Sequence, residues 1–179
     1  MASGLVYLHR VPLALVPHVE WTIAGVCGNQ IPISWHPSLE GVSERASVVS
    51  YSGAPDAGSI LATAFMNLKS MTFEVTQDPT GNDLGFRWSY SPSLGFFHAS
   101  TDGAGNILLS ENQIRAALVR AGDNPLKIQA EFRRLLGQAW DDELESFREK
   151  ALVIGTESNN GVVPTEAERI AYGQNVRPL

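Results

Sequence analysis

Apolar residues along the chain recur at the two spacings that distinguish strands from helices. An unbroken apolar run over residues 5–9 predicts a first strand that is covered on both of its faces. Apolar positions from Val19 to Val26 then recur at helical spacing, and Gly28 is placed to end that helix. Further strands are predicted at residues 31–35, 45–51 and 71–76, with a second helix between the last two.

The second predicted helix begins after Asp56, which is expected to cap it, and its buried stripe includes Ile60 and Phe65. The strand that follows alternates cleanly between apolar and polar residues, which predicts one face in water, and Glu74 lies on that face. The order up to this point is β-α-β-β-α-β, the split βαβ pattern of ferredoxin-like domains.

A β-meander is predicted after this first half, with strands at residues 86–90, 95–100 and 106–109. Ser110 opens a capping box that starts a helix, and Asn124 before a proline starts another. We expect the latter helix to run unbroken to about residue 150, with Trp140 as its core anchor. The predicted fold class is therefore α+β, a ferredoxin-like start extended by a β-meander and two C-terminal helices, then a loosely structured tail.

The length and composition indicate one domain. The chain has 179 residues, of which 44% are apolar, which is enough for a single hydrophobic core. The composition becomes linker-like near Gly155, so we predict a domain over residues 1–154 and a tail over residues 155–179. A capping box at Thr165 predicts one short helix in the tail, where Ile170 and Tyr172 are isolated apolar anchors.

Charge and cysteine content narrow the classes of function. The net charge is −6 and no basic run occurs, which disfavours binding to nucleic acid or to an anionic membrane. Cys27 is the single cysteine and cannot form an internal disulfide, which favours a reducing compartment. The N-terminus has no cationic start, and no apolar stretch approaches the roughly 20 residues that span a bilayer. These features predict a cytoplasmic protein.

The residues that carry chemistry do not form a recognisable catalytic motif. The histidines have no metal-ligand spacing, and no nucleotide-binding glycine loop occurs. Cys27 ends an apolar helix and is interpreted as a buried small residue. We therefore predict no catalytic residue, no metal and no cofactor. The histidines are His9, His18, His36 and His98.

Two clusters leave alternatives open. His18 and Trp21 lie three residues apart on a helix, so their rings can touch, either as structural packing, as a partner contact or as part of a catalytic site. The other cluster surrounds the loop at residues 77–85. Its carboxylates could do acid–base work, but the cluster is interpreted as turn residues and a solvated strand face. Its members are Glu74, Asp78, Asp83, Arg87 and Trp88. The acidic run that starts at Asp141 is interpreted in the same way, as the solvated face of the last helix.

Several segments together resemble the actinobacterial DUF3145 family over roughly residues 4–150. The matching segments are Gly4 to His9, Pro17 to Trp21, Phe73 to Pro79, Arg87-Trp88, Pro92 to Gly95, Gly105 to Ile107 and Leu136 to Asp141. The resemblance implies a small regulatory protein that binds, and inhibits, a biotin-dependent acyl-CoA carboxylase, in particular its carboxyltransferase component. Composition and spacing agree with an interaction protein but do not themselves point to this partner.

The leading prediction is thus a non-catalytic regulatory protein with a protein partner. Predicted contact residues are His18, Trp21, Arg87 and Trp88 in the domain, and Ile170, Tyr172, Arg177 and Leu179 in the tail. One alternative is a sensor of an acyl-CoA-type ligand, in an apolar pocket lined by Phe86, Trp88, Phe96 and Phe97. Another is an enzyme that uses His18 with a carboxylate.

Overall fold

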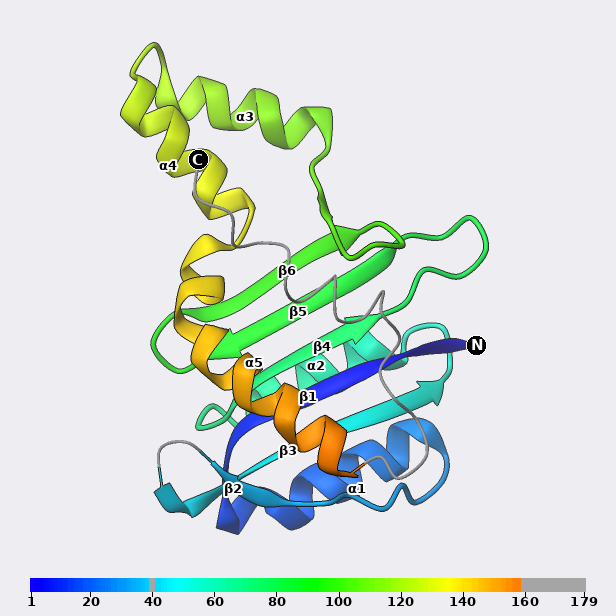
Figure 1. The fold of residues 1–179 in the computed structure, drawn as a ribbon. Coiled ribbons are helices and arrows are strands. Elements are labelled where there is room, and N and C mark those ends of the chain that lie inside the picture. The colour runs from blue at the N-terminus through cyan, green and yellow to red at the C-terminus, as the bar shows by residue number, and fades with distance from the viewer. Residues whose placement is uncertain (39–40, 159–179) are drawn as a thin grey trace.

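One antiparallel sheet organises the part of the chain that the structure describes (Figure 1). The computed structural model describes residues 1–38 and 41–158, and within them seven strands lie in the order β2-β3-β1-β4-β5-β6-β7. The strands are β1 (Ala2–Pro12), β2 (His36–Ser38), β3 (Gly41–Gly53), β4 (Thr72–Gln77), β5 (Gly85–Ser91), β6 (Gly95–Thr101) and β7 (Ile107–Leu108). The helices are η1 (Leu13–Leu15), α1 (Val16–Cys27), α2 (Ala57–Asn67), α3 (Glu111–Ala121), α4 (Pro125–Leu135) and α5 (Gln138–Ser158).

The first half of the sheet has the interleaved topology that the sequence predicts. The unit β1-α1-β2 is split by β3, which lies between its two strands, and the unit β3-α2-β4 is split by β1. This arrangement is the split βαβ pattern of ferredoxin-like domains. The strands β5, β6 and β7 continue the same sheet as a meander, so the predicted α+β class is confirmed.

Helices cover the two faces of the sheet differently (Figure 1). On one face, α1 and α2 pack on an apolar core whose buried members include Val6, Leu8, Phe65, Phe73 and Val75. On the other face, α5 crosses the middle strands and buries Leu144 against them. Strand β1 is buried on both faces, as its unbroken apolar run predicts.

The predicted strand at residues 31–35 is wrong, because these residues form an irregular segment and the short β2 begins only at His36. Ile31, Ile33 and Trp35 pack against the main core, which explains their alternation without a strand ladder. Pro32 between them has no N–H to donate to such a ladder. Trp35 is fixed instead by its indole, which donates a hydrogen bond to Oε1 of Glu20 at 2.8 Å.

The predicted last helix is not continuous. It is split into α4 and α5 at Gly137, whose φ of +72° no helical residue adopts. A Cβ built at Gly137 would lie 2.6 Å from Cζ of Phe97, so a side chain at this position would collide with the sheet. The chain therefore ends with three helices in its described part, and α5 continues beyond the predicted end at residue 150 to Ser158.

Local signals at the helix ends are mostly confirmed. Ser110 forms the predicted capping box with Gln113, and the Asn124 side chain accepts hydrogen bonds at the start of α4. Asp56 occupies the N-cap position of α2, although its side chain makes no capping hydrogen bond. Ile60, which the helical stripe predicts to be buried, is exposed. The stripe on α2 is consequently narrower than its apolar sequence indicates.

Candidate functional site

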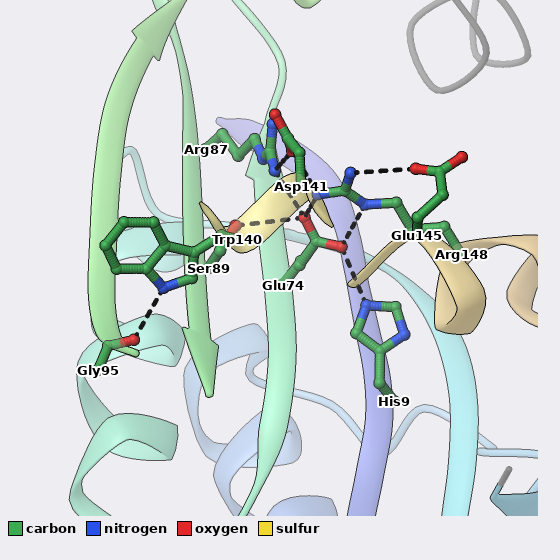
Figure 2. A network of polar contacts seen from close by, with 9 residues as sticks. All are labelled: His9, Glu74, Arg87, Ser89, Gly95, Trp140, Asp141, Glu145 and Arg148. Atoms are coloured by element: carbon green, nitrogen blue, oxygen red, sulfur yellow. Dashed lines mark hydrogen bonds and ion pairs between the residues drawn. The ribbon is translucent and has the colours of Figure 1, made fainter. Parts of the chain in front are cut away.

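A fully buried carboxylate, Glu74, lies at the centre of the contact between the sheet and α5. Strand β4 turns Phe73 and Val75 toward α1 and α2, so the side chain of Glu74 points to the opposite face. The prediction that this face is in water is wrong, because α5 covers it (Figure 2). A charge in this position requires partners, since an unpaired buried carboxylate is strongly disfavoured.

Four side chains satisfy the two oxygens of Glu74 (Figure 2). Arg148 on α5 binds it in a bidentate manner, with Nε 2.8 Å from Oε1 and a terminal nitrogen 2.6 Å from Oε2. The Arg87 guanidinium on β5 lies 3.2 Å from Oε2, and the Ser89 hydroxyl donates to the same oxygen at 3.2 Å. Nε2 of His9 on β1 lies 3.0 Å from Oε1. Three neighbouring strands and one helix thus meet at a single carboxylate.

Asp141 on α5 supplies the second negative charge of this ionic cluster. Its Oδ1 accepts from Arg87 and lies 2.9 Å from Arg148, so it bridges both guanidiniums. The prediction that Asp141 belongs to a solvated helix face is therefore wrong. Two carboxylates and two guanidiniums balance one another, and Glu145 approaches Arg148 at 3.7 Å from the solvent side. We call the set Glu74, Asp141, Arg87 and Arg148 the ionic cluster.

The pKa of Glu74 reflects the competition between burial and charge. Burial by itself raises this pKa, but the guanidiniums of Arg148 and Arg87, with hydrogen bonds from Arg148 and His9, outweigh it and hold the pKa well below its ordinary value. Glu74 is accordingly a carboxylate at neutral pH with its lone pairs occupied. It is poorly suited to accept a proton in acid–base catalysis and well suited to hold α5 in place.

Aromatic contacts extend the attachment of α5 on both sides of the ionic cluster. The Trp140 ring lies 5.1 Å from that of Phe97, and its indole donates to the Gly95 carbonyl at 3.0 Å. The Phe147 ring lies 5.6 Å from that of His9. Trp140 is only half-buried, so it anchors α5 at the margin of the sheet and not in a deep core as predicted.

His18 and Trp21 touch, as their helical spacing predicts. Their rings meet edge to face with centroids 5.6 Å apart near the N-terminal end of α1. Both residues lie at the surface, and Trp21 is 67% exposed. The pair is therefore presented to solvent by a helix whose opposite side, with Val19 and Ile23, is anchored in the core.

The other predicted contact residues of the domain are not presented in this way. Arg87 belongs to the ionic cluster, and Trp88 is buried in the main core. Both side chains are thus mostly covered, whereas His18 and Trp21 are the predicted contact residues that lie exposed among the described residues. Ile170, Tyr172, Arg177 and Leu179 lie outside the described residues.

The four aromatic residues predicted to line one pocket do not share a face. Phe96 pairs with Tyr90 and Phe97 with Ser89, so the two neighbours point to opposite sides of the sheet. Trp88 belongs to the core on the α2 side, whereas Phe97 packs under Trp140 on the α5 side. The single aromatic pocket expected for a ligand sensor is therefore not formed by these residues.

The surroundings of Cys27 and His98 favour a packing role for both residues over a chemical one. Burial raises the pKa of the Cys27 thiol, which disfavours the reactive thiolate and agrees with a packed small residue. The His98 ring stacks on Trp88 at 5.4 Å, and burial lowers the pKa of His98. Within residues 1–38 and 41–158, no group of three or more His, Cys, Asp or Glu side chains could hold a metal ion.

Sequence reasoning missed the ionic cluster, although one signal for it exists. Asp141, Leu144 and Arg148 are spaced by three and four residues and so lie on one face of a helix. Leu144 and Trp140 show which face is covered, and an arginine on that face requires a buried carboxylate opposite it. Glu74 is the matching charge in the middle of a strand.

Comparisons with known proteins identify the family of the chain. A family model described as a protein of unknown function, DUF3145, matches residues 5–154. The chain belongs to the DUF3145 family. The match covers the sheet apart from residues 2–4 of β1, and α5 as far as residue 154, so the ionic cluster and the His18–Trp21 pair lie within the DUF3145 region.

No curated protein and no solved structure matches this DUF3145 chain. Among the described residues, none of the helices combines the length and apolar character that crossing a bilayer requires.

Proposed function

We propose that this protein is a non-catalytic regulator that binds a biotin-dependent acyl-CoA carboxylase and inhibits it. The observation that carries the binding role is the exposed His18–Trp21 pair on α1. Tryptophan contributes more than most residues to protein interfaces, because its large ring is buried on binding at a low cost in conformational entropy. An edge-on histidine holds the ring in one orientation and lowers that cost further.

The state of the carboxylates supports a role without catalysis. The buried carboxylate of the sheet, Glu74, is engaged on both oxygens by Arg148, Arg87, Ser89 and His9. The ionic cluster holds α5 on the sheet, whereas the exposed His18–Trp21 pair lies on α1. The partner is the one that the resemblance to the DUF3145 family implies, and the carboxyltransferase component is the expected contact.

A direct binding assay tests this proposal. Purified wild-type protein is titrated against a purified actinobacterial acyl-CoA carboxylase, and both binding and the carboxylation rate are followed. Trp21→Ala is expected to weaken binding by roughly tenfold or more and to relieve inhibition in parallel. Leu94→Ala, which trims an exposed leucine in the turn between β5 and β6, is the matched control and should bind like wild type.

Each part of the proposal can fail separately. No saturable binding of the wild type to the carboxylase would overturn the choice of partner. Binding that Trp21→Ala leaves unchanged would move the interface away from α1. Because Trp21 is mostly exposed, its variant should keep the wild-type unfolding midpoint, so a loss of binding would not result from misfolding.

A further inference from the structure

The helices α3 and α4 form a hairpin that stands away from the sheet (Figure 1). The two helices pack on each other, and the buried residues of α3 are the small Ala117 and Ala121. No residue of α4 is fully buried. The hairpin thus adds little to the core of the domain. Both of its helices are nevertheless stabilised locally, α3 by a capping box and α4 by the side chain of its N-cap residue.

The turn of this hairpin carries the most exposed large apolar side chains of the described residues after Met1. Val119 in the last turn of α3 is 84% exposed, and Leu126 in the first turn of α4 is 77% exposed. Leu118 beside them is also exposed. We call Leu118, Val119 and Leu126 the hairpin tip. Isolated exposed apolar residues are ordinary, but several at the end of a projecting element mark an interaction site.

The charge of the hairpin differs from that of the rest of the chain. Residues 111–135 contain five basic and three acidic side chains, whereas the remainder contains eight basic and sixteen acidic ones. Glu111 pairs with Arg115, and Glu131 lies between Arg120 and Arg134. The charged side chains left over are Lys127 and Arg133 on α4 and Asp123 in the turn, and none of the three has an ion-pair partner among the described residues, so two basic charges exceed one acidic charge here. Lys127 follows Leu126 in the sequence, and Arg133, seven residues after Leu126, lies two turns further along the face that carries Leu126.

We propose that the hairpin tip inserts into an apolar cleft of the partner protein whose rim carries carboxylates. The apolar side chains of the tip supply the buried contact, and Lys127 with Arg133 meet the acidic rim. This inference rests on the proposed function and adds a second contact to Trp21. A second copy of the chain fits less well, because two tips related by a two-fold axis would bring the same basic side chains together. A nucleic acid would use the cations but not Val119 and Leu126.

The test compares two kinds of hairpin variant with matched controls, using the purified carboxylase complex as the probe. Val119→Gln with Leu126→Gln removes the two most exposed apolar side chains of the hairpin tip and keeps a good helix former at both positions. Lys127→Glu with Arg133→Glu reverses the charge. The controls are Ile60→Gln, an exposed apolar residue on α2, and Lys69→Glu, a lysine outside the hairpin. Thermal melts establish that every variant is folded.

The apolar variant is expected to weaken binding by roughly tenfold or more, mainly through faster dissociation. The charge-reversed variant is expected to slow association and to abolish the decrease of the association rate with added KCl. Both controls should bind like wild type.

Other results overturn the inference in distinguishable ways. One outcome is that wild type and both hairpin variants bind the carboxylase normally while Trp21→Ala does not. The hairpin is then not a contact, but the proposed function stands. If wild type does not bind the carboxylase, both proposals fail. If wild type sediments as a dimer that the apolar variant dissociates, the tip is a self-interface and the acidic cleft is excluded.

Discussion

At the scale of single residues, Glu74 determines how the second face of the sheet is covered. It collects contacts from β1, β5 and α5, and its charge is balanced within the ionic cluster. Buried ion pairs of this kind often add little net stability compared with apolar packing. Removing one partner, in contrast, strongly destabilises the folded state, because the remaining charges stay buried without compensation.

Glu74→Gln should destabilise the protein by about 3–5 kcal/mol, because Arg87 and Arg148 would keep their charges with only Asp141 close to both. Chemical denaturation at neutral pH measures the difference in unfolding free energy. The matched control is Glu111→Gln, which breaks an exposed pair with Arg115 and should cost less than about 1 kcal/mol. Equal costs for the two variants would contradict the role of the ionic cluster.

The same carboxylate predicts how stability depends on pH. The folded-state pKa of Glu74 lies well below the unfolded value of roughly 4.3, so between these two values the unfolded chain binds more protons. The contribution of Glu74 is therefore complete above about pH 4.3 and is lost as the pH falls through the folded pKa.

Urea midpoints measured from pH 7 downward should show this loss in wild type, and the acid limb should be flatter in Glu74→Gln. The carboxyls of Asp102 and Glu131 also have lowered pKa values, because of their hydrogen bonds with Asn106 and with Arg120 and Arg134, and contribute to the acid limb of both proteins. Comparing wild type with the variant cancels their contribution. An identical acid limb in the two proteins would exclude Glu74 as its source.

At the scale of elements, the junction between α4 and α5 controls where the hairpin points. Gly137 ends α4 in a left-handed conformation and lies against the Phe97 ring, and α5 starts at the next residue. Trp140, one turn further, is fixed to the Gly95 carbonyl. The hairpin is therefore joined to the sheet at a defined angle, which a docking element needs.

Gly137→Ala should destabilise the protein by about 1–3 kcal/mol, because alanine is strained at positive φ and its methyl group would collide with Phe97. Gly25→Ala within α1 is the control, since nothing lies within 4 Å of the added methyl group. It should stabilise the protein by about 0.5–1 kcal/mol through helix propensity. Thermal melts of both variants check the signs, and a neutral Gly137→Ala would mean that the junction is adaptable.

At the scale of the whole molecule, the two faces of the sheet are held by different forces. The α1 and α2 face is an apolar core, whereas the α5 face combines an ionic cluster with few apolar contacts such as Leu144. Apolar burial is insensitive to charge, while the attachment of α5 depends on four charged groups. The molecule is thus expected to open first at α5.

Glu74→Gln should increase hydrogen exchange in α5 more than in β1, β4 and α2, because only α5 loses its principal attachment. Mass spectrometry of exchange at neutral pH resolves these segments. The hairpin should lose its fixed position at the same time, so the variant is also expected to bind the carboxylase more weakly. A uniform rise in exchange across all segments would show that the two faces unfold together.

Local sequence patterns determined several strands and helix ends of this protein. The run at residues 5–9 indicated a strand buried on both faces, and Gly28, Ser110 and Asn124 marked helix ends correctly. These signals depend on neighbours within a few residues, which is why the sequence carries them. The order of elements also indicated the interleaved sheet, because split βαβ units have few alternative topologies.

Only the tertiary structure decided which polar faces are covered. Alternation in β4 gives the same pattern whether Glu74 meets water or α5, and α5 lies more than 60 residues later in the chain. The space at Gly137 is likewise limited by Phe97, a residue that no local pattern places beside it. The role of a charge or a glycine at a long-range contact depends on residues distant in the sequence. The ionic cluster and the position of the hairpin could therefore be identified only from the tertiary structure.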